Sequence, residues 1–150
     1  MPESVLGPGG ERLNVTPSFH RAAQSAGAVP VHTGSILTAR TVLATPAEKR
    51  DLRERSGAVA VDMESSIILE AAQAAGCPSL VIRGVSDDAQ HALPHELISL
   101  ITPEGRLRRA RAFSLAIIRP GAIPKAIALQ RNTKSALKAV ARLLASLSAL

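Results

Sequence analysis

GAVAVDMESSIILEAAQAAGCPSLVIRGVSDD, residues 57–88, is the stretch that decides the fold of this chain. The apolar run at 58–61 is short and lies between helical segments, which is typical of a buried strand. Apolar residues at helical spacing follow from Met63, and Gly76 ends that predicted helix. A second apolar run, at 79–85, predicts another buried strand. Strand, helix and strand in this order indicate an α/β architecture.

The segments before this stretch extend the alternation of strand and helix. Residues 28–37 predict a strand that is broken near a glycine. Thr45 and Glu48 have the spacing of a capping box, so a helix is predicted over 46–56. Residues 1–27 begin with several proline and glycine breakers and are expected to be a poorly defined segment, apart from a short helix near its end.

Helices are predicted for the remainder of the chain, after the second apolar run. They span 93–101, 107–118, 123–130 and 133–147. Asn132 is the expected cap of the last one. In that helix Leu137, Val140, Leu144 and Leu147 share one face, and Lys134, Lys138 and Arg142 share another.

The composition limits the classes of function. A chain of 150 residues with 46% hydrophobic residues suits one ordered domain. Aromatic residues make up only 1%, so a base-stacking nucleic-acid surface is nearly excluded, and no nucleic-acid partner is expected. Cys77 is the single cysteine and forms no internal disulfide. His32, His91 and His95 lack the ligand spacing of a zinc site, so no metal is expected.

The basic charge belongs to the C-terminal third. Residues 103–150 hold ten basic residues and one acid, whereas residues 1–102 hold eight basic and eleven acidic residues. A basic surface of this kind meets anions such as lipid head groups, and we expect weak contact with anionic membranes through this segment. A solvated basic face packed on the domain is the alternative. The chain starts with no secretory signal pattern and has no spanning apolar run, so we expect a cytoplasmic protein, either free or peripheral to the membrane.

Acidic residues follow both apolar runs. Asp62 and Glu64 come after the first, and Asp87 and Asp88 come after the second. Neighbouring parallel strands would bring both acid clusters to one edge of the sheet, where α/β proteins bind ligands. Carboxylates there can bind sugar hydroxyls or act as a general acid. Asp62 can equally serve as the cap of the following helix, so both interpretations stay open.

Two motifs in this region resemble the purine nucleoside phosphorylase and nucleosidase superfamily. They are GAVAVDMESSIILEAA at 57–72 and SLVIRGVSDDA at 79–89, in the order and spacing of the family, and HTGSILTARTVLATPAEKRDL at 32–52 resembles the segment before them. The resemblance implies a three-layer αβα fold with a central mixed sheet and a helical C-terminal tail. Residues 28–150 would form the C-terminal portion of that domain, with the family's N-terminal strands missing.

The C-terminal sequence resembles one subgroup of this superfamily. The LP pair at 93–94, PEGRLRRARAF at 103–113 and RPGAIPKAIAL at 119–129 are similar to the hopanoid-associated phosphorylases. The resemblance implies cleavage of the N-glycosidic bond of a purine nucleoside, by phosphorolysis or hydrolysis, with adenine release from adenosylhopane as the specific reaction. It implies no cofactor besides phosphate or water as co-substrate, and a homo-oligomer.

Roles carry over to the matching residues. Asp87 aligns with the general acid that protonates the departing purine, and a carboxylic acid with that task needs a raised pKa, which a buried pocket supplies. Glu64 aligns with the residue that binds ribose hydroxyls, and Met63 would pack against the ribose. Ser86 could orient Asp87 or cap the next segment, and Asp62 is a further candidate for substrate binding.

Two departures from the family pattern affect the site. The glycines at 7–10 are not expected to form the family's phosphate-binding turn, because no buried strand is predicted before them. Val42 stands near the place where many relatives have an aromatic ring over the purine.

Arg83 is expected to be structural, paired with a carboxylate or carbonyl. The alternative to an enzyme is a truncated non-catalytic remnant, or half of a split enzyme that needs a partner chain.

Overall fold

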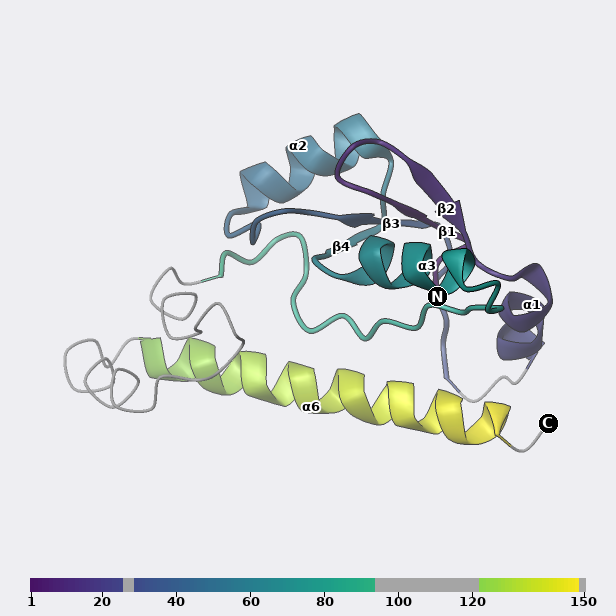
Figure 1. Ribbon diagram of the computed structural model, residues 1–150. Helices are drawn as coiled ribbons and strands as arrows, with labels where there is room; N and C mark the ends of the chain where they lie inside the picture. Colours follow the sequence, from purple (N-terminus) through teal and green to yellow (C-terminus); the bar gives the residue numbers. More distant parts are fainter. Residues whose placement is uncertain (26–28, 94–121, 149–150) are drawn as a thin grey trace.

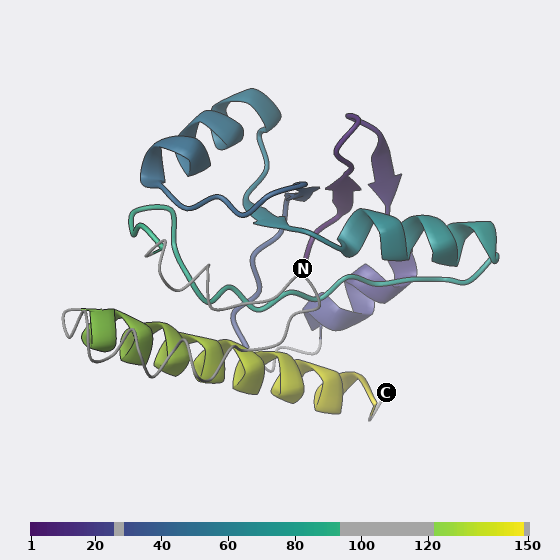
Figure 2. The same cartoon turned by 60° about the vertical axis from the view of Figure 1, so that its left-hand side comes forward.

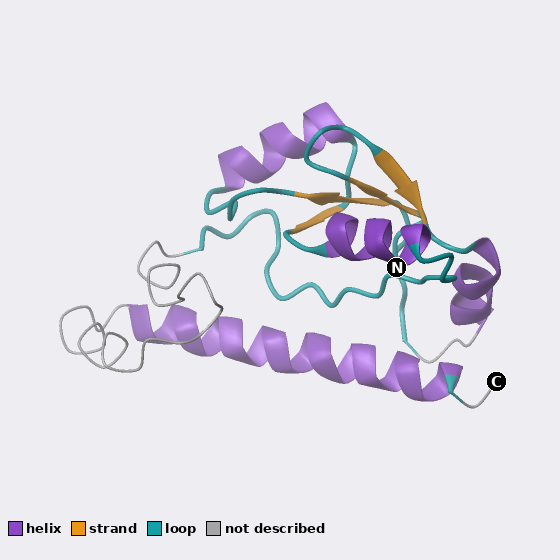
Figure 3. Cartoon of the chain, viewed as in Figure 1, coloured by secondary structure: helices purple, strands orange, loops and turns teal. Residues whose placement is uncertain are grey.

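The computed structural model describes residues 1–25, 29–93 and 122–148. A mixed four-stranded sheet lies within them in the order β2-β1-β3-β4 (Figure 3). The strands are β1 (Ser4–Leu6), β2 (Arg12–Asn14), β3 (Ser35–Thr38) and β4 (Ala60–Asp62). β1, β3 and β4 run parallel, while β2 pairs antiparallel with β1. The prediction of an α/β fold around a mixed sheet is confirmed.

Helices lie on both sides of this sheet. They are α1 (Pro17–Ser25), α2 (Pro46–Ser56), α3 (Ser65–Ala74) and α6 (Ala122–Leu147). Figures 1 and 2 show α2 on one side of the sheet and α3 on the other. The long helix α6 runs beyond the loop at 77–93, on the side of the sheet away from α2. The helices predicted at 93–101 and 107–118 lie outside the described residues, apart from Leu93.

The hydrophobic core lies between the sheet and α3. Val5 of β1, Val15 after β2 and Leu69 of α3 form one buried cluster, with Leu13 and Val81 packed against it. Since β1 has all three of its residues buried, it is the central strand of this core. The parallel register sets Thr38 at the end of β3 beside Asp62 at the end of β4, so the two polar side chains meet at the carboxyl edge of the sheet.

The predicted capping box of α2 is confirmed. The Thr45 hydroxyl accepts from the backbone N–H of Glu48 at 3.2 Å, and the Glu48 carboxylate accepts from the N–H of Thr45 at 2.8 Å. The backbone hydrogen bond from Thr45 is the main reason that the pKa of Glu48 lies below its ordinary value. Gly57 ends the helix in the left-handed conformation, with φ of 68°.

The strand predicted over 28–37 is shorter in the structure, where only Ser35–Thr38 joins the sheet. Gly34, just before it, has φ of 123°, and a Cβ there would lie 2.9 Å from Cγ1 of Val59. The chain therefore turns tightly against the segment that leads into β4 before it can enter the sheet. Only a glycine combines this backbone conformation with so close an approach.

The prediction of a buried strand at 79–85 is wrong. This segment forms no ladder with the described strands. Its first residue, Ser79, is held by Thr16: the Thr16 N–H donates to the Ser79 carbonyl, and the Ser79 N–H donates to the Thr16 hydroxyl, both at 2.8 Å. Further along, the side chain of Arg83 pairs with the carboxyl end of β4. Apolar composition alone does not make a strand, because a strand also needs a neighbour in register.

The N-terminal segment, for which the sequence predicted little structure, contains β1, β2 and α1. The breakers at 7–10 form the turn between the two strands, in which the N–H of Gly7 donates to the Glu11 carbonyl at 2.8 Å. The expectation that no buried strand precedes these glycines is wrong, since β1 is buried. Three residues carry too little periodicity to be recognised as a strand in the sequence.

The C-terminal helix is continuous where two helices were predicted. Asn132 lies inside α6 and is not a cap, and the Thr133 hydroxyl donates to the Leu129 carbonyl at 2.8 Å. The buried face is also shifted from the predicted one: Leu143 is buried, whereas Leu137 and Leu144 are exposed. Within the described ranges, no helix is long and apolar enough to cross a membrane.

Candidate active site

The carboxyl end of β4 is organised around Asp62. Its side chain is 11% exposed and accepts hydrogen bonds from the Thr38 hydroxyl at 3.1 Å and from the backbone N–H of Ser65 at 3.2 Å. The Ser65 hydroxyl also donates to this carboxylate. The N–H of Ser66 in turn donates to the Thr38 hydroxyl at 2.9 Å. The N-cap position of α3 belongs to Glu64, which makes no side-chain cap hydrogen bond, so the prediction that Asp62 is the N-cap is wrong. Asp62 instead accepts from the first N–H of the helix from two residues further back.

Arg83 reaches across from the loop at 77–93 to the same carboxylate. Its Nε lies 2.8 Å from Oδ2 of Asp62 and donates to the Ser65 hydroxyl at 3.0 Å. A terminal nitrogen lies 3.5 Å from Oε2 of Glu64, which is otherwise exposed. The expectation that Arg83 pairs with a carboxylate agrees with this geometry. The arginine therefore fixes the loop to the sheet, in place of backbone pairing.

Asp87 has its own cation, which sequence analysis did not assign. Nζ of Lys49, in the first turns of α2, lies 2.7 Å from Oδ2 of Asp87. The lysine side chain is 9% exposed and the aspartate side chain 31%. The hydroxyl of Ser86 lies 3.5 Å from the other carboxylate oxygen, at the limit of a hydrogen bond. The signal for Lys49 in the sequence was the resemblance of residues 32–52 to a lysine-bearing segment of the superfamily, which gave the lysine no role.

The side chain of Asp88 binds residues of its own loop, in contrast to the side chain of Asp87, which binds Lys49. Oδ1 of Asp88 accepts from the N–H groups of Gln90 and His91, both at 2.9 Å, and lies 2.6 Å from Nδ1 of His91. The hydrogen bond from the His91 side chain is the main reason that the pKa of Asp88 lies below its ordinary value. Both side chains are exposed. This pair holds a turn at the surface.

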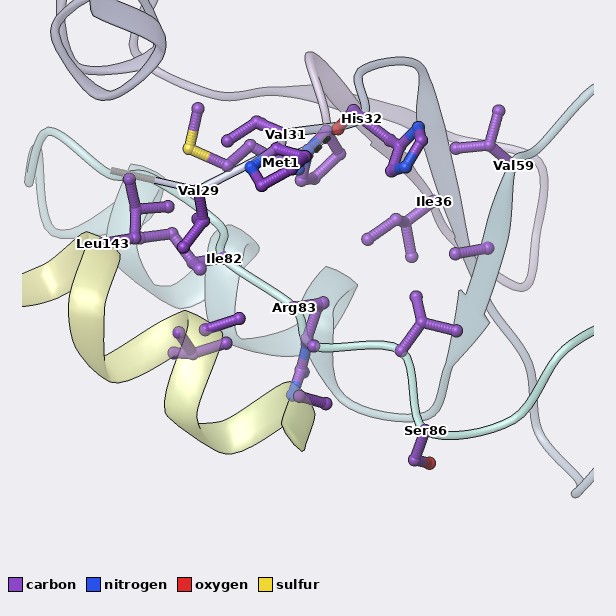
Figure 4. Close-up of a pocket in the computed structure, with 18 of the residues that line it drawn as sticks. Met1, Val29, Val31, His32, Ile36, Val59, Ile82, Arg83, Ser86 and Leu143 are labelled. Atoms are coloured by element: carbon purple, nitrogen blue, oxygen red, sulfur yellow. Dashed lines mark hydrogen bonds between the residues drawn. The ribbon is translucent and has the colours of Figure 1, made fainter. Parts of the chain in front are cut away.

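Two adjoining cavities open onto these groups. The smaller, of about 490 Å³, has polar residues of α2, β4 and the loop at 77–93 in its lining, among them Lys49, Asp62, Ser86 and Asp87. The larger, of about 1010 Å³, shares Ser86 and Asp87 and extends toward α6. Figure 4 shows its apolar lining, with Val29, Val31, Ile82 and Leu143 gathered near Met1. Both volumes suit small organic ligands.

The N-terminus closes one side of the larger cavity. The amino group of Met1 donates to the His32 carbonyl at 2.7 Å, the dashed contact of Figure 4. Burial lowers the pKa of this amino group, because desolvation disfavours its charged form. The first residues of the chain are thereby attached to the segment that leads into β3.

The structure brings some of the predicted site residues together and leaves others apart. Asp62, Ser86 and Asp87 line the smaller cavity. Met63 and Glu64, which follow Asp62, have exposed side chains that line neither of these two cavities. Val42 is exposed as well, and its neighbour Leu43 lines the smaller cavity. In the part of the chain that the structure describes, no three His, Cys, Asp or Glu side chains gather as a metal site.

The arrangement offers two carboxylates of different character. Asp62 is buried and saturated by hydrogen bonds, so it has little capacity left for a ligand. Asp87 uses one oxygen for Lys49, and its other oxygen has, within residues 1–25, 29–93 and 122–148, only a long contact to Ser86. Of the two, Asp87 is the carboxylate that can exchange a proton with a bound molecule or accept a hydrogen bond from it.

Comparison with known proteins agrees with this fold. Residues 8–119 match the family model described as the phosphorylase superfamily. A futalosine hydrolase of Streptomyces coelicolor is 43% identical over 76 residues, which cover 50% of this chain and 31% of that enzyme. The chain thus matches about a third of the length of this relative. No solved structure matches the chain.

Proposed function

Because the chain belongs to the phosphorylase superfamily, we propose that it cleaves the N-glycosidic bond of a purine nucleoside. The observation that carries this proposal is Asp87, a carboxylate on the wall shared by two cavities, one oxygen of which has no close partner among the residues that the structure describes. The similarity to a futalosine hydrolase, over half of the chain, supports the same type of reaction.

In the proposed reaction Asp87 first takes up a proton from solvent, on the oxygen that does not face Lys49, and then transfers that proton to a ring nitrogen of the purine. The electron pair of the C–N bond goes to the base, and the ribose takes on oxocarbenium character until phosphate or water attacks its anomeric carbon. No further cofactor is needed for this balance. Met63 and Glu64 line neither cavity, and in this proposal they contact the ribose from the exposed surface that directly follows Asp62 in the chain.

We further propose adenosylhopane as the substrate, with adenine as the released base. The apolar part of the larger cavity supports this choice, because a nucleoside with a large hydrocarbon substituent needs an apolar space beside its ribose. Futalosine, on which the Streptomyces coelicolor relative acts by name, is the competing candidate. Adenosine lacks either substituent and serves as the minimal probe.

The test is base release from adenosylhopane, futalosine and adenosine, each with and without phosphate. We expect adenine release to be fastest from adenosylhopane, and its dependence on phosphate identifies the nucleophile. Asp87→Asn should lower kcat by about 100-fold or more, the usual contribution of a general acid. Asp51→Asn is the control, since Asp51 is exposed and paired only with Arg55 on α2. Release that is unchanged in Asp87→Asn contradicts the assignment.

The alternative, a non-catalytic remnant or half of a split enzyme, makes a different prediction. The purified chain would then release no base from any of the three compounds at any phosphate concentration. Release that appears only after a second chain is added would identify the split enzyme. Robust release from the chain alone contradicts both versions.

We also propose weak contact with anionic membranes through α6. The stripe Arg131, Lys134, Lys138 and Arg142 is exposed, and α6 contains no acidic residue. Each well-placed cation is worth about 1 kcal/mol near an anionic surface. Co-sedimentation should be stronger with vesicles that contain phosphatidylserine than with neutral ones, and should weaken with salt. Equal sedimentation with both would contradict this contact.

A homo-oligomer is the last part of the proposal. Ile67 and Ile68 of α3 are exposed, as are Val59 and Val61 around β4, the strand at the sheet edge. Exposed apolar side chains on an edge strand and its adjoining helix favour association with another copy of the chain. Light scattering should give a mass above that of one chain, and Ile67→Asp should reduce it. A monomer at all concentrations would contradict this part.

A further inference from the structure

Lys49 has a role that neither the family match nor the sequence motifs assign. We propose that Lys49 is a positioning residue: it holds the loop at 87–91 and presents Asp87 to the cavity with one oxygen free. This inference rests on the proposed function, because it concerns how Asp87 is made ready for the base. It names a residue of α2 as part of the same site.

All three N–H donors of the Lys49 ammonium are in use. Nζ of Lys49 lies 2.7 Å from Oδ2 of Asp87, 2.7 Å from the carbonyl oxygen of Asp88 and 3.0 Å from the carbonyl oxygen of His91. An ammonium has three donors, so none is left for a ligand. Although Lys49 lines the smaller cavity, it is thus not a phosphate-binding group in this structure. Its hydrogen-bond donors all bind acceptors of the protein itself.

The acceptors belong to one short loop, and this gives the contacts their mechanical effect. The ammonium group of Lys49 binds two backbone carbonyls and one side chain that all belong to five consecutive residues, 87–91. A fourth link lies beside them, where the N–H of Leu93 donates to the Ala44 carbonyl at 2.8 Å. The loop is therefore attached to the start of α2 at several points, although it belongs to no strand or helix.

Lys49 can hold the loop because its own backbone is fixed. Its N–H donates to the Thr45 carbonyl at 3.1 Å, directly after the capping box of Thr45 and Glu48. The lysine side chain is also buried, with 9% exposed. A buried cation is stable only when its donors are satisfied, and the loop supplies the acceptors. The loop and the lysine thus depend on each other.

As a consequence, the two carboxylate oxygens of Asp87 have different contacts. Oδ2 is held by Lys49 at 2.7 Å, whereas the one contact of Oδ1 in the described part of the chain is with Ser86, at 3.5 Å. The oxygen that carries and transfers the proton is therefore Oδ1, and the lysine keeps its three protons throughout. Without Lys49 the carboxylate could rotate, and either oxygen could turn away from the base.

The test compares Lys49→Met, which removes the charge at similar length, with Lys49→Arg, which keeps the charge but spreads its donors over a planar group. Arg50→Met is the matched control, because Arg50 is the next residue of α2 and is exposed. Two quantities are measured for each variant. They are the kcat and KM of adenine release from adenosine, and the amide hydrogen exchange of residues 87–93.

We expect Lys49→Met to lower kcat about 100-fold, as a misplaced reacting group does, with KM changed less than about threefold. Lys49→Arg should fall in between, about tenfold below the wild type, because the guanidinium cannot place three donors at one point. Exchange in the loop should be faster in Lys49→Met and unchanged in Arg50→Met. A kcat in Lys49→Met equal to that of the wild type overturns the proposal.

The two readouts separate failure of this inference from failure of the proposed function. If the wild-type chain releases no base from adenosylhopane, futalosine or adenosine, the proposed function fails, and hydrogen exchange still tests the loop: unchanged exchange in Lys49→Met overturns the positioning role. If Lys49→Met does not fold by circular dichroism, the comparison of Lys49→Arg with the wild type carries the test. Equal kcat and equal exchange in that pair overturn the proposal.

Discussion

The ion pair between Arg83 and Asp62 gives the most direct test of how the loop is held to the sheet. The perturbation is Arg83→Met, which keeps the length of the side chain and removes the cation. Asp62 would keep its hydrogen bonds from Thr38 and Ser65, but its charge would remain, 11% exposed, without a counter-ion. The variant should therefore be less stable than the wild type.

The size of the effect follows from the burial of the two partners. Loss of one partner from a fully buried pair costs about 3–5 kcal/mol. The Arg83 side chain is 36% exposed, so solvent screens part of the interaction. We expect a loss of about 2 kcal/mol in the free energy of unfolding, which is roughly a 30-fold change in the unfolding equilibrium constant. For a chain of this length the melting temperature should fall by about 6 °C.

The assay is urea unfolding followed by circular dichroism, with Arg55→Met as the matched control. Arg55 pairs with Asp51 at 2.6 Å, but their side chains are 69% and 62% exposed, so its loss should cost about 0.5 kcal/mol or less. The double variant Arg83→Met/Asp62→Asn should lose less than the sum of the single variants, because the uncompensated charge is gone. Equal losses in Arg83→Met and Arg55→Met would refute the reasoning.

Three further predictions concern packing, capping and titration. Leu69→Ala should cost about 3 kcal/mol in urea unfolding, since Leu69 is fully buried, whereas the exposed Ile68→Ala should stay within about 0.5 kcal/mol of the wild type. Thr45→Ala should cost about 1 kcal/mol, because it removes the cap of α2, and unchanged stability would contradict the role of the capping box. The hydrogen bonds of Asp88 lower its pKa, so they stabilise the loop at neutral pH and this contribution is lost as the pH falls through the lowered pKa. In His91→Ala, a carboxyl titration by NMR should show the pKa of Asp88 rise toward its ordinary value.

Local features of the fold were predictable because short-range chemistry decides them. Thr45, Glu48 and Gly57 define α2 through hydrogen bonds and a left-handed cap that involve only neighbouring residues. The apolar run at 58–61 contributes to β4 for a similar reason, since it is too short for a helix and lies between two of them. The prediction that this strand is buried is wrong, because Val59 and Val61 are exposed in and beside β4. The α/β architecture follows from this order of elements, whereas the mixed sheet was an expectation from the family resemblance, and its antiparallel strand β2 lies in the segment for which little structure was predicted.

Features that depend on distant partners were not predictable. Residues 79–85 have the composition of a strand, yet they lie outside the sheet, where Ser79 is bound to Thr16 and Arg83 is paired with Asp62. The buried face of α6 is set by what lies opposite it, and Leu143 is buried where Leu144 had been expected. The periodicity of a sequence predicts that a helix has an apolar face, but it does not predict which part of the protein will pack against that face.

The sequence by itself determined that the chain is an α/β protein with acidic groups after two apolar segments, because strand and helix patterns and capping residues act over a few neighbours. Only the tertiary structure decided what each acid does. Asp62 and Asp87 look alike in the sequence, and each is paired with a cation more than twenty residues away, Arg83 for one and Lys49 for the other. The first is saturated by hydrogen bonds, and the second keeps one oxygen free. Charge pairing acts through space, so the fold had to bring the partners together before the two carboxylates could differ.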